Sequence, residues 1–344
     1  MDVYVQLSRI FRGIMKKLTI LILSDIHYAS APERVRRGHE LQVVGTPLLR
    51  LAAHTFRHFV WLRDPFAHNH LLDHVLSQSR GVDYAIANGD YSCDTAFVGV
   101  SDDAACQSAR ECLGKLRQEF GSRFQATIGD HELGKMSLFG GCGGLRLASW
   151  HRAQAELALK PFWQVKFGRY VLLGVVSSLL ALPVYEPEAL ADERLAWRKL
   201  RAAHLSEIRR AFAALEPDER VILFCHDPTA LPFLWHDEVV RSKLSQVEQT
   251  IIGHLHTRLV LWKSRLLAGM PRIHFLGNSI RRMSSALNEA RHWRPFKVRL
   301  CPALAGSELF QDGGYYLVEL DPEAVQPLSF RFRRLKRDLS TQRL

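Results

Sequence analysis

The sequence predicts a layered α/β fold, and three features of the chain support this prediction. Short apolar runs with the length of buried strands alternate with longer segments whose apolar residues repeat at helical spacing. Most of these runs end in glycine, aspartate or histidine. No internal repeat and no low-complexity linker divides the 344 residues. One domain with insertions therefore fits the sequence better than two domains.

Five apolar runs predict the strands that carry functional groups. The first is LTILIL at residues 18–23, which leads directly into the sequence SDIH. Short runs rich in Ile, Val and Leu are typical of strands that are buried on both faces. The other four runs lie in VDYAIANGD (82–90), FQATIGD (124–130), RVILFCH (220–226) and TIIGHLH (250–256).

The segments between and after these runs predict helices and a second group of strands. Apolar residues at helical spacing predict helices over 70–79, 102–120 and 190–215. Strands that alternate with helices favour a sheet whose functional groups lie at the carboxyl ends of the strands. Four later segments predict a second sheet region, at residues 169–178, 271–279, 315–320 and 328–334.

We expect a single domain over residues 15–326 with an extension at each end. Residues 1–14 have apolar residues at helical spacing with arginines between them, so we expect them to lie on an anionic membrane, to pack on the domain, or to be an upstream extension before Met15. Residues 327–344 form a basic strand or tail. Three insertions interrupt the domain, at 31–69, 133–162 and 281–310.

The first insertion contains a segment that is apolar on much of its circumference, LQVVGTPLLRLAAHTFRHFVWL at residues 41–62. Long excursions in a compact domain are often lids or binding loops. A helix buried against the body of the domain is an equally good interpretation. The sequence leaves both alternatives open.

Composition restricts the compartment and the class of partner. The net charge of +11 favours anionic partners such as phosphorylated substrates, acidic lipid or nucleic acid. The six cysteines show no CxxC spacing, which indicates a reducing compartment. No apolar run approaches the roughly 18 residues of a spanning helix, and LTILIL is too short for a signal peptide. We therefore expect a cytoplasmic protein, with peripheral membrane contact as an open alternative.

Carboxylate and imidazole side chains follow the predicted strands at the point where each strand ends. Placing such groups beside a core costs free energy unless they are paired or bind a metal. Their mixture of oxygen and nitrogen atoms suits hard or borderline divalent ions. The set is too large for one ion and suits two ions that share a bridging carboxylate. Its members are Asp25, His27, Asp90, Asp130, His226, His254 and His256.

In order and in strand context, these residues resemble the signature of the calcineurin-like metallophosphoesterases. That signature is DxH, then GD, then GNH[ED], then a lone His, then GHxH. Each block alone is weak, because an HxH pair is more often two surface histidines, but the set is specific. In this chain the blocks are Asp25-Ile26-His27, Gly89-Asp90, Gly129-Asp130-His131-Glu132, His226 and Gly253-His254-Leu255-His256.

The resemblance implies a four-layer α-β-β-α sandwich of two packed mixed sheets flanked by helices. It also implies two divalent metal ions, of a kind that the sequence does not identify among Mn²⁺, Fe²⁺ or Fe³⁺, Zn²⁺ and Mg²⁺. By this resemblance Asp25, His27, Asp90 and His256 hold the first ion, and the bridging Asp90 with Asp130, His226 and His254 holds the second.

The activity implied by the resemblance is metal-dependent hydrolysis of a phosphoester or pyrophosphate bond. A hydroxide that bridges the two ions attacks phosphorus, and Asp90 holds both ions in place. His131 lies beside the leaving group and protonates or stabilises the departing oxygen. No covalent nucleophile is required.

The chain departs from the family pattern at Asp130, where family members usually have asparagine. Aspartate also binds metal, but it carries a full negative charge and has no N–H donor for the substrate phosphate. We expect tighter metal binding with a less acidic bridging water, or a preference for a harder ion such as Mn²⁺ or Mg²⁺.

The substrate is less constrained than the site. Asn88, Arg281 and Arg282 are candidate substrate contacts. The apolar insertion, the N-terminal extension and the positive charge favour a phosphorylated small molecule or an amphiphilic lipid- or nucleotide-linked substrate near an anionic membrane. UDP-diacylglucosamine, which some family members hydrolyse, is one example.

Two alternatives remain at this point: a non-catalytic scaffold of the same fold that binds protein partners, and a nuclease-like phosphodiesterase. A scaffold would have lost ligands and His131, which this chain keeps. No separate nucleic-acid-binding motif accompanies the basic tail. Nothing in the sequence specifies an oligomeric state.

Overall fold

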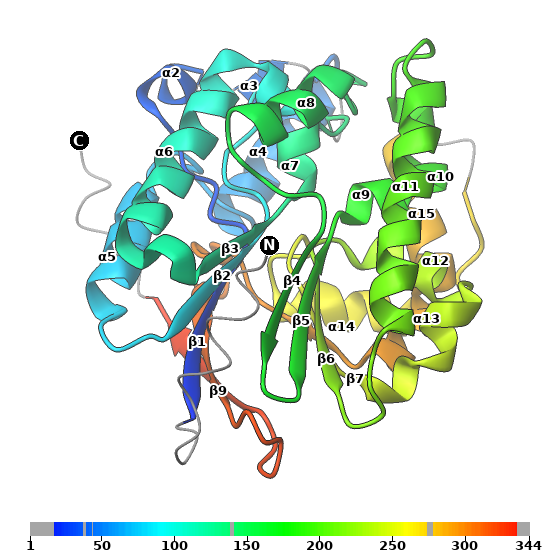
Figure 1. Cartoon of the computed structure of the whole chain (residues 1–344). Coiled ribbons are helices and arrows are strands. Elements are labelled where there is room, and N and C mark those ends of the chain that lie inside the picture. Colours follow the sequence, from blue (N-terminus) through cyan, green and yellow to red (C-terminus); the bar gives the residue numbers. More distant parts are fainter. Residues whose placement is uncertain (1–16, 37–38, 43, 138–140, 274–277, 336–344) are drawn as a thin grey trace.

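The computed structural model describes residues 17–36, 39–42, 44–137, 141–273 and 278–335. The expected extension at 1–14 and the end of the expected tail lie outside these residues. Two five-stranded sheets stand side by side with helices on their outer faces (Figure 1). Each sheet contains both parallel and antiparallel neighbours. The predicted four-layer sandwich of mixed sheets is confirmed.

The first sheet has the strand order β10-β9-β1-β2-β3. The three strands β1, β2 and β3 run parallel, so their carboxyl ends lie at one edge of the sheet. On the other side of β1, β9 is antiparallel to β1, and the edge strand β10 is antiparallel to β9. The bounds are β1 Leu18–Leu23, β2 Tyr84–Asn88, β3 Phe124–Thr127, β9 Gly314–Leu320 and β10 Ser329–Arg334.

The second sheet has the order β4-β5-β6-β7-β8. Its last four strands are parallel, and β4 forms an antiparallel pair with β5. The carboxyl ends of β6 and β7 therefore also lie at one edge. The bounds are β4 Trp163–Phe167, β5 Tyr170–Val175, β6 Arg220–Cys225, β7 Val247–Ile252 and β8 Val298–Leu300.

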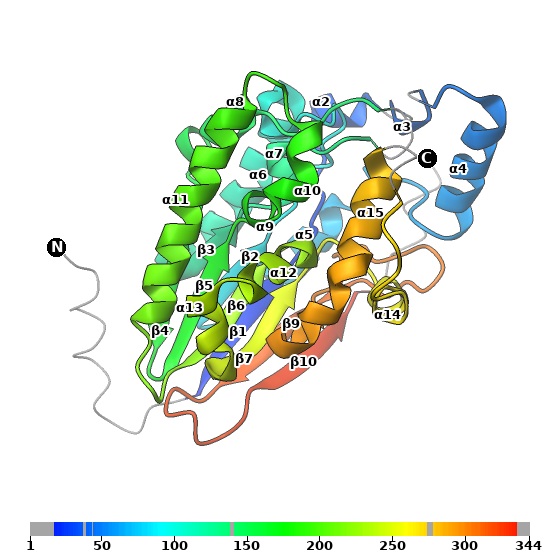
Figure 2. The same cartoon turned by 90° about the vertical axis from the view of Figure 1, so that its right-hand side faces the viewer.

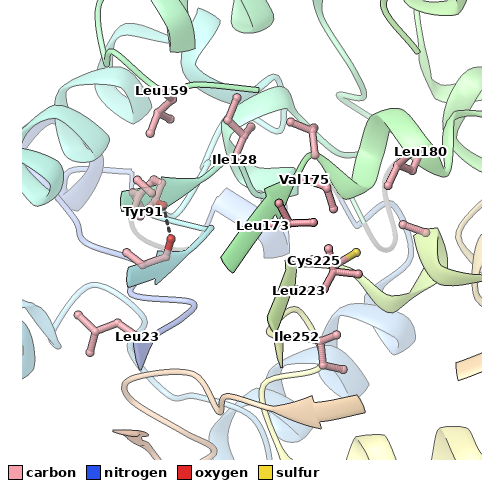
Figure 3. Packing of buried hydrophobic residues seen from close by; sticks show 14 of the residues in the cluster. Leu23, Tyr91, Ile128, Leu159, Leu173, Val175, Leu180, Leu223, Cys225 and Ile252 are labelled. Carbon is pink, nitrogen blue, oxygen red and sulfur yellow. Dashed lines mark hydrogen bonds between the residues drawn. The ribbon is translucent and has the colours of Figure 1, made fainter. Parts of the chain in front are cut away.

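Alternating side chains of the strands build two separate apolar cores. In β1, Ile20 and Ile22 belong to a cluster that contains residues of both sheets and none from the helices. Leu21 and Leu23 belong to a larger cluster that contains residues of both sheets and of the helices. Side chains of successive residues in a strand point to opposite faces, so a strand covered on both faces is continuously apolar. Figure 3 shows part of the cluster that includes helical residues, with Leu23 labelled.

The long predicted helices are present with small shifts of their ends. They are α5 (Asn69–Gln78), α6 (Asp103–Phe120) and α11 (Arg194–Ala213). The side chain of Asp102 caps α6 by accepting hydrogen bonds from the backbone N–H groups of Ala104 and Ala105. The other helices are α2 Ala31–Arg34, α3 His39–Gln42, α4 Pro47–Phe59, α7 Asp130–Leu133, α8 Leu147–Ala155, α9 Ser177–Leu180, α10 Leu182–Tyr185, α12 Leu231–Trp235, α13 Glu238–Ser242, α14 Arg258–Leu266 and α15 Asn278–Glu289. Short 3₁₀ helices are η1 Gly99–Ser101, η2 Gly121–Arg123, η3 Glu186–Glu188, η4 Pro228–Ala230, η5 Leu244–Gln246 and η6 Ala290–Phe296.

The strand predicted at 271–279 is wrong in the part of it that the structure describes. Residues 271–273 have no regular structure, and α15 begins at Asn278. Beyond the predicted strand, Ile280, Met283 and Leu287 recur at helical spacing, and this pattern corresponds to the helix that forms there. The second sheet is instead completed by β8, which lies inside the expected insertion at 281–310 and is too short to show an alternating pattern.

Helix α4 of the first insertion is exposed, so the interpretation of a helix buried against the domain is wrong. Ala53 is its one buried residue, whereas Leu48, Leu51 and Phe59 are 83%, 64% and 62% exposed. The helix projects from one side of the molecule (Figure 2). In the described part of the chain, no helix has the length and hydrophobicity that crossing a bilayer requires.

A buried histidine far from the predicted ligands makes the stability dependent on pH. His204 of α11 is 2% exposed, and its Nε2 accepts a hydrogen bond from the backbone N–H of Val176 at 3.0 Å. Burial lowers the pKa of His204 from 6.5 to about 3. Between these values the unfolded chain binds a proton that the folded chain does not, so stability falls as the pH decreases from 6.5.

We expect His204→Gln to weaken this acid sensitivity, because the glutamine oxygen accepts the same hydrogen bond without titrating. Between pH 7.5 and pH 5 the wild type should lose about 2 kcal/mol more unfolding free energy than the variant. Urea unfolding with EDTA at both pH values measures this difference. Equal losses in the two proteins would contradict the assignment.

Candidate metal centre

The structure brings all seven predicted ligands to the carboxyl ends of five strands. These ligands form two groups. The members of one group follow β1, β2 and β7, and the members of the other follow β3, β6 and β7. Within each group the nearest ligand atoms all lie within 4.8 Å of one another. The first group is Asp25, His27, Asp90 and His256, and the second is Asp130, His226 and His254.

Five of these seven residues have a left-handed backbone conformation, with φ between 48° and 60°. This conformation costs a non-glycine residue on the order of 1–3 kcal/mol, so it persists where the surrounding structure enforces it. Strain of this kind concentrates at functional sites. Here it turns side chains from the strand ends toward a common point. The five are Asp25, His27, Asp90, His254 and His256.

Asp25 and the two histidines of the first group face one another. Nε2 of His256 lies 3.1 Å from Oδ1 of Asp25 and 3.3 Å from Nε2 of His27. The Asp25 carboxylate also accepts hydrogen bonds from the Ser24 hydroxyl and the His254 backbone N–H. These bonds fix the carboxylate at the end of β1.

Asp90 lies between the two groups. Its Oδ2 is 3.1 Å from Nε2 of His226, which belongs to the second group. In that group, Oδ1 of Asp130 lies 3.0 Å from Nε2 of His226 and 2.9 Å from Nδ1 of His254. Asp90 is therefore the carboxylate that would contact both ions.

The donor atoms of this site fit metal cations. Nδ1 of His226 lies 2.6 Å from the carbonyl oxygen of Asn88, so a neutral His226 ring carries its proton on Nδ1 and would present the lone pair of Nε2 to a metal ion. Nε2 and Oδ2 of Asp90 are both buried, and neither has a hydrogen-bond partner among the described residues. Two acceptor atoms that face each other in a buried site need a cation between them.

One backbone carbonyl orients two of the site histidines. Nδ1 of His27 and Nδ1 of His131 each lie 3.2 Å from the carbonyl oxygen of Ser92. This contact places the ring proton on Nδ1 in both residues and turns Nε2 into the site. Burial lowers the pKa of His27 to about 4 and that of His131 to about 3. Both rings are neutral at pH 7, which is the state that His27 needs as a metal ligand.

Carboxylates and histidines in the site shift each other's pKa in opposite directions. Burial by itself would raise the pKa of Asp25, but the charges of His256 and His226 outweigh it and hold this pKa to about 2. Burial is likewise outweighed at Asp130, whose pKa is lowered well below its ordinary value chiefly by His254. Conversely, the surrounding carboxylates raise the pKa of His226 despite burial. The site thus attracts positive charge.

Glu132 links the loop of Asp90 to the loop of Asp130. Its carboxylate accepts hydrogen bonds from the backbone N–H groups of Gly129, Asp90 and Tyr91, at 2.8, 3.0 and 2.8 Å. Burial, with the charge of Asp90 added to it, raises the pKa of Glu132 to about 8. It therefore supports the positions of two loops.

The three candidate substrate contacts lie in different surroundings. Asn88 is fully buried, and its side-chain amide donates to the carbonyl of Ile251, so it joins the sheets and positions His226. Arg282 donates to Glu188 at 2.9 Å beside the site. Arg281 lines a cavity of about 410 Å³ between α10, α12 and α15.

Three contributors to the site were not among the predicted residues. The Trp61 ring stacks on the His256 ring, with centroids 4.9 Å apart, and brings the first insertion to the metal centre. The Ser92 carbonyl has no sequence signature. Lys135 contacts Asp130, with Nζ 3.0 Å from Oδ2. The aspartate at the position of the usual asparagine was a signal for this lysine, because a buried negative charge needs a cation beside it.

Comparison with solved structures identifies the class of fold. The chain matches the crystal structure of a dimetal phosphatase from Danio rerio with a TM-score of 0.51 and 14% identity, over 92% of this chain and 96% of that chain. It therefore has the calcineurin-like metallophosphoesterase fold that the motifs predicted. At this identity the likeness extends to the fold alone.

Two other matches are weaker. A purple acid phosphatase from yellow lupin (Lupinus luteus) seeds aligns with 70% of this chain and 38% of its own, at 13% identity and a TM-score of 0.32. A metallophosphoesterase from Sphaerobacter thermophilus aligns over 92% of this chain and 88% of its own, at 13% identity and a TM-score of 0.30. No family model and no curated protein matches the sequence.

Proposed function

We propose that the protein is a phosphohydrolase that uses two divalent metal ions to cleave a phosphoester or pyrophosphate bond. The observation that carries this proposal is the position of Asp90, whose buried and otherwise unpartnered Oδ2 lies between two groups of ligand atoms. When bound, two such cations activate a water molecule and neutralise the charge of a phosphate group.

The chain's own residues then have separate tasks. The seven residues of the two groups would hold the ions, and Asp90 would fix the distance between them. Nε2 of His131 lies 3.8 Å from Oδ2 of Asp90, at the side of the centre. A phosphate dianion next to this ring raises its pKa through Coulomb attraction, so His131 can take up a proton and donate it to the leaving oxygen.

Exposed apolar side chains around the centre support an amphiphilic substrate. Trp61 connects α4 to His256, and the loop at 307–310 bonds to the backbone of Val60 and Trp61. Helix α14 begins just after His256, and it lies on the same side of the molecule as α4 (Figure 2). The exposed residues, here called the apolar rim, are Leu48, Leu51, Phe59, Trp262, Leu266, Leu309 and Phe310.

We further propose that the apolar rim and the positive charge hold the protein at an anionic membrane surface while it acts on a lipid- or nucleotide-linked phosphate. Burying one such side chain contributes roughly 1.5–3 kcal/mol. Leu48→Gln, Leu51→Gln and Phe59→Gln together should therefore lower kcat/KM for a lipid-linked pyrophosphate by at least about tenfold. The rate with p-nitrophenyl phosphate should stay unchanged.

Val325→Gln is the matched control, because Val325 is 82% exposed in the β9–β10 turn, at the opposite end of β1 from Asp25. It should leave both rates unchanged. An unchanged rate with the lipid-linked substrate in the triple variant, also after deletion of residues 1–14, would contradict the membrane proposal and leave the hydrolase proposal standing.

A panel of phosphate compounds tests the activity itself. The purified protein with Mn²⁺ is assayed on a monoester, a diester, a nucleotide-linked pyrophosphate and single-stranded DNA. We expect hydrolysis of at least one small phosphate compound, and loss of it on treatment with EDTA. DNA cleavage that falls steeply with salt would favour the nuclease-like alternative. No hydrolysis of any compound would contradict the proposal.

A further inference from the structure

The two carboxylate oxygens of Asp130 face different partners. Oδ1 lies 3.0 Å from Nε2 of His226 and 2.9 Å from Nδ1 of His254, in the second group of ligands. Oδ2 lies 3.0 Å from Nζ of Lys135. Asp130 is 2% exposed, so the ammonium is the counter-charge of a buried carboxylate. The residue thus divides its oxygens between the metal position and a lysine.

An asparagine in this position would use its atoms in the same geometry but with different chemistry. Its oxygen would occupy the place of Oδ1, and its amide N–H groups would occupy the place of Oδ2 and point outward as donors. Aspartate has an acceptor there, so a donor is lost and a negative charge is gained. The Lys135 ammonium supplies both a donor and a positive charge at that place.

The fold directs Lys135 to this position through a glycine turn. Gly134 has φ +92°, and a Cβ atom there would lie 2.4 Å from the carbonyl oxygen of Gly144. Only glycine fits this turn, which ends α7 and returns the chain to the centre. The Lys135 side chain is 25% exposed, so part of it is in contact with solvent.

Lys135 directly contacts a proposed ligand of the second ion, because its Nζ lies 3.0 Å from Oδ2 of Asp130. Arg282 is the other cation beside the site, and it donates two hydrogen bonds, of 3.2 and 2.9 Å, to the Glu188 carboxylate. Lys135 is therefore the better placed cation for a phosphate group.

We propose that Asp130 and Lys135 together replace the asparagine of related sites, and that Lys135 binds a phosphate oxygen of the substrate. Asp130 ligates the second ion through Oδ1, and Lys135 neutralises Oδ2 while its remaining N–H donors face the phosphate. This inference rests on the proposed function. The pair has the net charge of an asparagine, and it restores the donor that aspartate lacks.

A double-mutant cycle of wild type, Lys135→Met, Asp130→Asn and the double variant tests the pair. We measure metal content after Mn²⁺ loading and the Kd of inorganic phosphate for each loaded protein. Lys135→Met should keep both ions and weaken phosphate binding by about 10- to 100-fold, because a charge-assisted hydrogen bond is lost. Asp130→Asn should also keep both ions and change turnover only modestly.

The double variant is the decisive protein, because its asparagine supplies a neutral donor without needing the lysine. Its phosphate affinity should return to within about threefold of wild type, which is a strongly non-additive result. An affinity no better than that of Lys135→Met would overturn the proposal. So would unchanged phosphate binding in Lys135→Met, or loss of an ion from that variant.

Lys115→Met is the matched control, because Lys115 forms an exposed ion pair with Asp73 at 2.7 Å. It removes the same charge without touching the metal centre and should leave phosphate affinity unchanged. A wild-type protein that binds no metal and hydrolyses nothing refutes the proposed function. A wild-type protein that is active but shows an additive cycle refutes the Asp130–Lys135 pair alone.

Discussion

Replacing Asp90 with asparagine is expected to lower hydrolysis by on the order of 10³-fold and to reduce the bound metal from two ions to one or none. The carboxylate lies between the two groups of ligand atoms, with Oδ2 at 3.1 Å from Nε2 of His226. An amide lacks the negative charge that attracts both cations. Metal analysis after Mn²⁺ loading and steady-state kinetics on the same sample measure both effects.

Asp83→Asn controls for the loss of an aspartate from the same strand region. Asp83 precedes β2 at the end opposite the metal centre, where its carboxylate accepts a hydrogen bond from the Thr19 backbone N–H at 2.8 Å. This variant should bind two ions and keep its activity. Full activity and two bound ions in Asp90→Asn would show that Asp90 does not hold the centre together.

His131→Gln is expected to leave both ions in place and to lower kcat by about 10²–10⁴-fold for substrates with a poor leaving group. The His131 ring is oriented by the Ser92 carbonyl and belongs to neither of the two groups, although its nearest ring nitrogen lies within 4.8 Å of carboxylate oxygens of Asp90 and Asp130. A residue that protonates the leaving oxygen matters less when that oxygen leaves as a stable anion. The loss should therefore be much smaller for p-nitrophenyl phosphate than for an alkyl phosphate.

The exposed His151 of α8 provides the control variant His151→Gln, which should have wild-type kinetics with both substrates. An equal loss for the two leaving groups in His131→Gln would exclude a role as general acid. Loss of an ion would instead place His131 among the groups that stabilise the metal centre.

Sequence reasoning could locate the candidate ligands because their chemistry conflicts with their surroundings. Aspartate and histidine directly after a buried strand need a partner, and parallel strands bring their carboxyl ends together. The motif order then predicted the two-sheet fold. The structure agrees with the convergence of strand ends, from Asp25 after β1 to His256 after β7.

Contacts that depend on tertiary placement could not be predicted in this way. The Ser92 contact is made by a backbone carbonyl, which every residue has. Trp61 reaches His256 from an insertion whose direction is set by packing. The exposure of α4 was undecided because a helix with apolar residues around it suits either a core or a binding surface. Strand β8 is too short for its periodicity to be read.

Anomalous X-ray diffraction from crystals of the Mn²⁺-loaded protein tests the metal centre most directly. We predict two peaks separated by about 3.5–4 Å, with the Asp90 carboxylate in contact with both. One should lie among Asp25, His27 and His256, and the other among Asp130, His226 and His254. A single peak, or peaks away from these side chains, would contradict the account of the protein as a two-metal phosphohydrolase.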